Sequence, residues 1–275
     1  MPAQRVPFRS LGLNGAGAAV LLFLAAVTAV PAHAADCGQS TPWGLPEVTD
    51  RHGIAVVCHE GYPAGLDRVA REPRWVAYEL TAEHDLGCLP RNGLSFKVDV
   101  LADASEQGTP NDYAKSGYDL GHMAPNEDFA WDAGEQRDTF SMANVAPQVP
   151  GLNRQGWERL EEDVRGWALT RGDLQVYVGP IYSETPKTIG VDKLPVPSVF
   201  YKIVVDRQTG EEIGFMLPNK VIKKGAVQPW HAAMATVEDK ANISLPEPPN
   251  ASEGSVAWTE DLQVWRAAHK SACMN

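Results

Sequence analysis

The most informative part of the chain is a set of three short blocks: YDLGHMAPN at 118–126, SMANVAPQ at 141–148 and LNRQGWERLE at 152–161. The first contains a histidine preceded by glycine and followed closely by proline. The second contains an asparagine and a glutamine, and the third an asparagine and a glutamate on a helical pattern. One proton acceptor and several neutral amide oxygens around few carboxylates indicate a site for a hard divalent cation and a water molecule.

The third block opens a regular amphipathic pattern. Apolar residues recur at helical spacing, and charged residues occupy the other faces; the apolar set is Trp157, Leu160, Val164, Trp167 and Ala168. This spacing predicts an amphipathic helix over 153–170 that Gly172 ends.

Most of the remaining pattern is strand-like. β-Branched and aromatic runs separated by turn residues predict strands at 53–58, 75–81, 140–145, 174–178, 199–205 and 212–217. Residues 102–117 are polar and predict a loop. Residues 257–270 predict a final short helix. Strands with few helices and no alternating strand–helix rhythm predict an α+β fold with a largely antiparallel central sheet.

The N-terminal segment has the pattern of an export signal. Arg5 and Arg9 precede an apolar run over about 16–30, and Ala32-His33-Ala34 fits a small-x-small cleavage site. A membrane anchor is the alternative, but the run is shorter than the ~18 apolar residues that a span needs. We therefore expect cleavage near Ala34, no membrane anchor, a periplasmic or secreted protein, and a single domain at 35–275.

Four cysteines remain after that cleavage: Cys37, Cys58, Cys88 and Cys273. None forms a Cys-x-x-Cys pair, so a zinc site is not expected, and an even number in an exported protein indicates two disulfides. Three connectivities are open. We favour Cys37–Cys58 and Cys88–Cys273, because the first would hold the new N-terminus and the second would close a long loop.

The charge of the chain limits how it can hold a polyanion. Loss of Arg5 and Arg9 leaves 22 basic residues against 35 acidic ones, a net charge of −13 for residues 35–275. This net charge argues against a general basic surface for nucleic acid, since non-specific affinity grows with the number of cations that contact phosphates. A nucleic-acid substrate would need a local basic patch and a metal.

The candidate site residues each have a plainer alternative. Gly121 and Pro125 indicate a fixed turn that presents His122, whose side chain suits proton removal from water near neutral pH. Asn153 could be a neutral oxygen ligand or an ordinary helix N-cap. Glu161 could hold a metal-bound water or be a solvated charge. Asn144 and Gln148 could equally be buried amides that brace a loop.

Together the three blocks resemble the DNA/RNA non-specific endonucleases of the ββα-metal superfamily, relatives of Serratia nuclease and endonuclease G. The family's Asp-Arg-Gly-His corresponds to Asp119–His122, its Asn-x-x-Pro-Gln to Asn144–Gln148, and its Leu-Asn followed by Trp-x-x-Leu-Glu to Leu152-Asn153 and Trp157–Glu161. The spacing of the last block is identical, and looser likeness covers most of the chain after residue 53.

The resemblance implies a ββα-metal motif and a role for each matching residue. His122 would be the general base, Asn153 the one direct protein ligand of Mg²⁺ (or of another divalent cation such as Mn²⁺), and Glu161 a holder of metal-bound water. Arg91 would steady the phosphate, although its spacing matches only approximately. Asp119, Asn144 and Gln148 would line or brace the site. The substrates would be DNA and RNA, and the products would carry 5′ phosphates.

One departure from the signature stands next to the histidine. Leu120 replaces the arginine of Asp-Arg-Gly-His and so removes a cation from the site. Two alternatives to a DNA/RNA endonuclease therefore stay open: a module that binds nucleic acid without cutting it, and a hydrolase of small phosphodiesters, which an acidic protein would tolerate.

Overall fold

The computed structural model describes Met1, Cys37 and residues 41–49, 53–225, 227–253, 258 and 262–274. The expected export signal and its cleavage after Ala34 lie outside the described residues, apart from Met1. The chain divides into two units, Met1–His33 and Ala34–Asn275, and all that follows concerns the second. Among the described residues, no helix is both long enough and apolar enough to cross a membrane.

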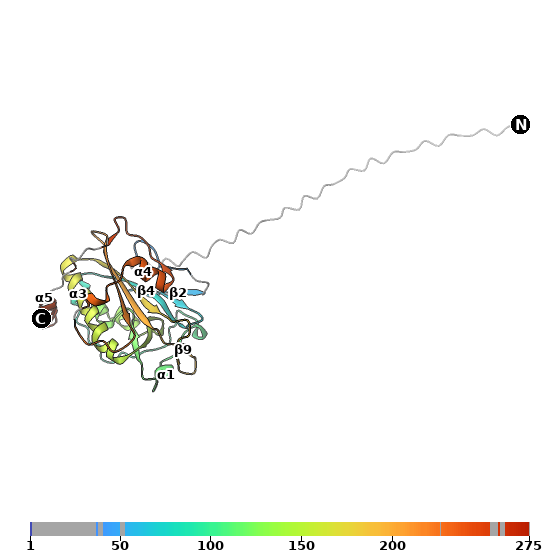
Figure 1. Ribbon diagram of the computed structural model, residues 1–275, viewed down its shortest axis with the longest axis horizontal. Coiled ribbons are helices and arrows are strands. Elements are labelled where there is room, and N and C mark those ends of the chain that lie inside the picture. Colours follow the sequence, from blue (N-terminus) through green and yellow to red (C-terminus); the bar gives the residue numbers. More distant parts are fainter. Residues whose placement is uncertain are drawn as a thin grey trace. The chain divides into compact units, whose positions relative to one another are not determined.

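A twisted sheet forms the centre of this unit (Figure 1). Six strands pair antiparallel along it, and a short seventh pairs parallel at one edge. Their spatial order is β13 (Ser252–Glu253), β11 (Glu211–Pro218), β10 (Val199–Asp206), β7 (Leu174–Ile181), β4 (Glu72–Leu80), β3 (Pro63–Asp67) and β2 (Ile54–Cys58). The expected α+β fold with a largely antiparallel sheet is confirmed.

Both faces of the sheet are buried, because alternate side chains of each central strand enter two different cores. In β4, Val76 and Tyr78 join a core that also contains the apolar face of α3 (Glu158–Arg171). Trp75 and Ala77 join the other core, under α4 (Met234–Ala241). Successive side chains of a strand point to opposite faces of the sheet, so the sheet forms the middle of three layers, between α3 and α4. The site segments lie on the α3 side.

Five of the six predicted strands are found, and one five-residue strand of the central sheet was not predicted. The missed strand is β3, whose sequence Pro-Ala-Gly-Leu-Asp lacks a strand pattern. Gly65 is required there because a Cβ atom at this position would lie 2.2 Å from the indole of Trp75. The indole of Trp75 thus occupies the space where a side chain at position 65 would lie. The sequence of β3 alone does not reveal this requirement for glycine.

The ββα motif is present, with two differences from expectation. Asp119–His122 is not a turn but the strand β5, antiparallel to β6 (Val145–Gln148). Gly121 serves close packing, since a Cβ there would lie 2.4 Å from Oε1 of Gln148. The predicted strand at 140–145 is also wrong: a 3₁₀ turn occupies Met142–Asn144, and β6 begins only at Val145.

The helix that follows β6 begins as a π-helical turn, η6 (Leu152–Trp157), and continues as α3 to Arg171. The predicted apolar face is buried at every position, and Gly172 ends the helix with a φ of +93°. Gly156 lets the segment around Ile222 approach, and its N–H donates to the carbonyl of Ile222 at 3.0 Å. The wider turn shifts the register just where Asn153 enters the site.

Short elements complete the unit. They are α1 (Pro110–Tyr113), α2 (Ala133–Asp138), α5 (Leu262–Met274), the 3₁₀ turns at His84–Leu86, Ala104–Glu106, Asn126–Phe129 and Gln228–Trp230, and the strand pairs β1 (Glu47–Val48) with β12 (Ile243–Ser244) and β8 (Thr188–Ile189) with β9 (Leu194–Pro195). The expected loop at 102–117 thus contains two short helical turns, and the final helix extends to 274 rather than 270.

Both favoured disulfides are present, Cys37–Cys58 and Cys88–Cys273. The second joins residues separated by 185 positions, so it ties α5 to the region before the first site block.

Candidate active site

A cavity of about 590 Å³ opens beside the ββα motif. Four predicted site residues line it together: Arg91 from a loop, His122 from β5, Asn153 from η6 and Glu161 from α3. Leu120 lines it as well, and its side chain also packs against an apolar cluster that includes Val145. Residues 70 positions apart in sequence therefore meet at one cavity.

His122 is held by aromatic packing. Its ring lies edge-on to Phe140, with centroids 5.2 Å apart, and 4.8 Å from Phe96. Its Nε2 atom is buried without a hydrogen-bond partner in the described part of the chain. Burial lowers the pKa of His122 to about 3, and the charge of Arg91 acts in the same direction. The imidazole is therefore neutral at physiological pH, the protonation state that a general base requires.

Asn153 does not cap a helix. Its own N–H is already within the helical turn, and its side-chain Nδ2 donates to Oδ2 of Asp119 at 3.0 Å. An amide that donates through Nδ2 has its carbonyl oxygen left for another partner. Asp119 also accepts from Nε and Nη2 of Arg154, at 2.8 and 2.6 Å. One carboxylate thus orients an amide and a guanidinium on the same wall.

Glu161 lies half-buried on the first turn of α3, and the charge of a buried lysine of the sheet acts on it. Lys202, on β10, is completely buried, and its ammonium lies 5.1 Å from the ring centroid of Trp157. Burial raises the pKa of Glu161, while the charges of Lys202 and Arg165 oppose that rise. The glutamate is therefore not the solvated surface charge of the plainer alternative but part of a buried charge cluster.

Arg91 reaches the cavity from an exposed loop. Its guanidinium carbon lies 5.1 Å from the ring centroid of Phe140, the same ring that packs against His122. This aromatic contact fixes the cation close enough to influence the imidazole.

Asn144 and Gln148 are completely buried and are not among the residues that line the cavity. Asn144 accepts from the N–H of Ala124 and donates to the carbonyls of Ala124 and Thr139. Gln148 packs against Gly121 across the β5–β6 pair. Both residues therefore brace the strand that carries His122, which is the plainer of the two roles expected.

Sequence reasoning missed several residues of the cavity. Arg165 is one helical turn beyond Glu161, a spacing that could have revealed it, and it donates to Asp128 and Glu127 at 2.8 and 2.9 Å. Asp85 also lines the cavity, and burial raises its pKa to about 8, so it adds little negative charge near neutral pH. Trp265, His269 and Cys273 enter from α5, with no local signal in the sequence.

The donor set fits a hard divalent cation. Asn153, with its amide oxygen, and Glu161, with its carboxylate, line the same cavity, and a few oxygen ligands of this kind are what Mg²⁺ takes from a protein. Cys88, His269 and Cys273 also lie together, but their two sulfur atoms are bonded to each other and offer no thiolate.

Comparison with known proteins agrees with this geometry. The family model of the DNA/RNA non-specific endonucleases matches residues 47–252. Endonuclease G, mitochondrial, of Homo sapiens is 32% identical over 200 residues, which is 66% of this chain and 64% of that protein. Nuclease EXOG, mitochondrial, of Xenopus laevis is 32% identical over 171 residues, covering 57% of this chain and 48% of that protein.

A solved structure shows the same fold. A chain in the crystal structure of the EndoG/EndoGI complex superposes with a TM-score of 0.71 at 28% identity, covering 80% of this chain and 94% of that one. This chain spans about 64% of the length of the curated endonuclease G proteins that it matches. Since the family model covers most of the second unit, including all three blocks, the chain belongs to the DNA/RNA non-specific endonuclease family.

Proposed function

We propose that the protein is an exported, Mg²⁺-dependent endonuclease that hydrolyses phosphodiester bonds of DNA and RNA with little sequence preference and leaves 5′ phosphates. Its family is one of metal-dependent nucleases. The observation that carries the proposal is the convergence of His122, Asn153, Glu161 and Arg91 on one cavity.

In the proposed reaction each side chain has one task. His122, kept neutral by burial, accepts a proton from the attacking water as the water oxygen bonds to phosphorus. The P–O3′ bond breaks, and the departing 3′ oxygen takes a proton from a water molecule. Asn153 and Glu161 would hold the cation, Asn153 directly and Glu161 through water. A bound divalent cation supplies positive charge where negative charge develops on the phosphate. Arg91 binds a phosphate oxygen and brings the backbone within reach of the imidazole.

The test is incubation of purified protein with supercoiled plasmid and with single-stranded RNA. We expect both to be degraded in Mg²⁺, with Mn²⁺ as a second metal, and neither in a chelator. Asn153→Ala should abolish Mg²⁺-dependent cleavage while the protein remains folded. Retention of plasmid in a gel without cleavage would favour a binding module instead, and hydrolysis of a chromogenic diester without plasmid cleavage would favour a small-diester hydrolase.

Export rests on separate support. Two disulfides are typical of proteins that fold in an oxidising compartment. N-terminal sequencing of protein recovered outside the cytoplasm should begin at Ala35. Recovery of the mature activity only from the cytoplasm, with Met1 retained, would contradict this part of the proposal.

A further inference from the structure

Helix α5 lies beyond the region that the family model matches. The family model ends at residue 252, whereas α5 occupies Leu262–Met274 and contributes Trp265, His269 and Cys273 to the wall of the cavity. A segment beyond the shared domain is therefore part of the site surface, and its contacts indicate what it does there.

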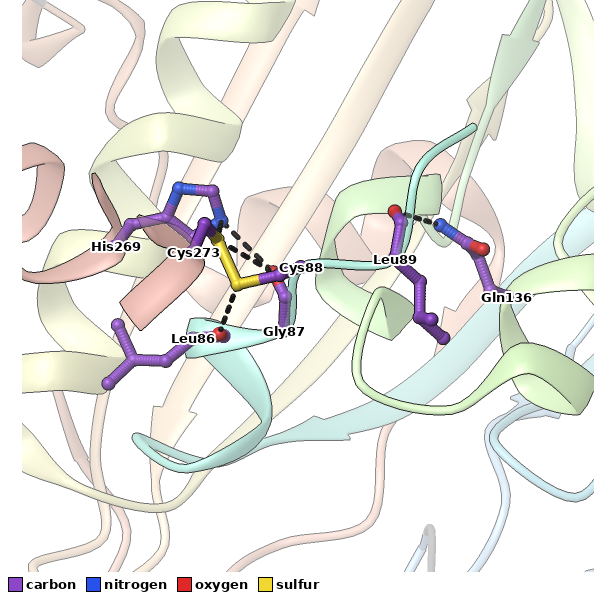
Figure 2. The surroundings of a disulfide bond; sticks show 7 residues. All are labelled: Leu86, Gly87, Cys88, Leu89, Gln136, His269 and Cys273. Atoms are coloured by element: carbon purple, nitrogen blue, oxygen red, sulfur yellow. Dashed lines mark hydrogen bonds between the residues drawn. A yellow bond between two sulfur atoms is a disulfide. The ribbon is translucent and has the colours of Figure 1, made fainter. Parts of the chain in front are cut away.

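The first set of contacts holds the loop that leads to Arg91. Figure 2 shows the disulfide joining Cys273 of α5 to Cys88, with the imidazole of His269 beside it. Nε2 of His269 donates to the carbonyl of Gly87 at 3.0 Å. Two successive residues of the loop are thus attached to α5, one covalently and one by a hydrogen bond.

The opposite side of the loop is attached to the body of the domain. Nε2 of Gln136, on α2, donates to the carbonyl of Leu89 at 2.9 Å (Figure 2), and the N–H of Leu89 donates to the carbonyl of Ala130 at 2.8 Å. Residues 87–89 are therefore clamped between α5 and α2. Arg91 follows two residues later, on an exposed stretch of the loop.

The second set of contacts fixes α5 to the helix that carries Glu161. Arg266 donates to Glu162 of α3 at 2.8 Å. Arg165 of α3 lies under the ring of Trp265, 5.4 Å from its centroid. Helix α5 thus connects the wall of the cavity that bears Glu161 with the loop that bears Arg91.

We propose that α5 and the Cys88–Cys273 disulfide are a positioning device for substrate binding, which holds Arg91 where it meets a phosphate of the nucleic acid. An exposed arginine on an unattached loop would lose conformational freedom each time substrate bound, and a clamped loop has lost most of it beforehand. This inference rests on the proposed function and assigns a role to a segment beyond its shared domain.

The test compares the two disulfides. Cys88→Ser with Cys273→Ser removes the clamp, and Cys37→Ser with Cys58→Ser is the matched control, because those cysteines are not among the residues lining the cavity. We expect KM for duplex DNA to rise at least about fivefold in the first pair, while kcat changes by less than about twofold, as for loss of a binding contact. The control pair should keep the KM of the wild type.

Two further measurements separate positioning from general destabilisation. In an Arg91→Ala background, removing Cys88–Cys273 should add no further rise in KM, since the residue being positioned is absent. His269→Ala, which keeps the disulfide, should also raise KM, by a smaller factor than loss of the disulfide does. Binding of a labelled oligonucleotide in chelator should weaken in parallel.

The outcomes are distinguishable. An unchanged KM without the disulfide, or an equal rise with and without Arg91, would overturn the positioning role. Should the cysteine pair fail to fold, the His269→Ala variant alone decides, and an unchanged KM there overturns it. A wild-type protein that cleaves neither plasmid nor RNA would instead remove the proposed function itself.

Discussion

Asp119 and Asn153 are joined by a 3.0 Å hydrogen bond from the amide of the asparagine to the carboxylate of the aspartate. The bond links β5 to η6 and so fixes one side of the cavity. It also determines which end of the Asn153 amide is available, because the nitrogen is already engaged. Asp119 is therefore expected to act on the metal through Asn153 rather than by direct ligation.

Asp119→Ala should weaken metal binding without removing a ligand. Loss of such a supporting partner typically costs 10–100-fold in metal affinity, so the Mg²⁺ concentration for half-maximal cleavage should rise by about that factor. Asp192→Ala is a matched control, since Asp192 pairs with Arg71 at 2.7 Å and is not among the residues lining the cavity. An unchanged Mg²⁺ requirement in Asp119→Ala would contradict the supporting role.

Arg154 offers the cation that Leu120 removes from the signature. Its side chain is 69% exposed at the cavity, and Asp119 engages only two of its five N–H donors. Arg154→Ala should therefore raise KM for DNA several-fold, leave kcat nearly unchanged and reduce the salt dependence of binding by about one phosphate contact. The measurements are steady-state kinetics and oligonucleotide binding across a salt series.

Two variants sharpen this test. Arg68→Ala removes an exposed arginine that is paired with Glu106 but is not among the cavity-lining residues, and it should leave KM unchanged. Leu120→Arg places a guanidinium beside Asp119 and should restore much of the affinity lost in Arg154→Ala. Failure of that rescue, with both variants folded, would mean that the two positions do not serve the same phosphate.

The sequence pattern predicted those parts of the protein whose structure depends on residues close together in the chain. The buried face of α3, from Leu160 to Ala168, follows from helical spacing alone, and strands β7 and β10 follow from β-branched runs. The three blocks located His122, Asn153 and Glu161 because their residue types and intervals belong to one motif. Each of these features is encoded within a few turns of chain.

What sequence did not reveal depends on contacts between distant segments. Gly121 looks like a turn residue, but its lack of a side chain makes room for Gln148 on the paired strand. Lys202 has the sequence context of an ordinary lysine in a strand, yet it is completely buried and its charge acts on Glu161. The wall formed by Trp265 and His269 is about a hundred residues beyond the motif. Nothing near these residues in sequence signals their partners.

Lys202→Met should weaken metal binding through Glu161. The substitution nearly keeps the length of the side chain but removes one of the two cations that stabilise the carboxylate, Arg165 being the other. The pKa of Glu161 should therefore rise further, and less of it should be ionised near pH 7. Mg²⁺ affinity, measured by calorimetry, should fall at pH 7 and recover as the pH is raised toward 9. Exposed Lys240, paired with Asp239, provides a control by the same substitution. An equal loss of affinity at every pH would point to a packing defect.

His122→Ala tests the general base directly. Loss of a proton acceptor of this kind typically costs 10²–10⁴-fold in rate, and the loss should fall on kcat rather than on KM. The neighbouring rings of Phe96 and Phe140 keep the site packed, so the far-ultraviolet circular dichroism should match that of the wild type. A folded variant with unchanged kcat would remove the imidazole from the mechanism.

The burial of His122 also predicts how stability depends on pH. In the metal-free folded protein the pKa of this imidazole is about 3, well below the value of about 6.5 in an unfolded chain. Between those two values the unfolded state binds a proton that the folded state does not, so the contribution of His122 is fully present above pH 6.5 and declines as the pH falls toward 3. The decline can reach about 1.4 kcal/mol per pH unit.

His122→Asn has no titrating group, so urea unfolding in chelator should show a smaller loss of stability from pH 6.5 to 4.5 than in the wild type. Parallel curves for the two proteins would show that the folded site accepts the proton readily, and that the ring is not kept neutral by burial.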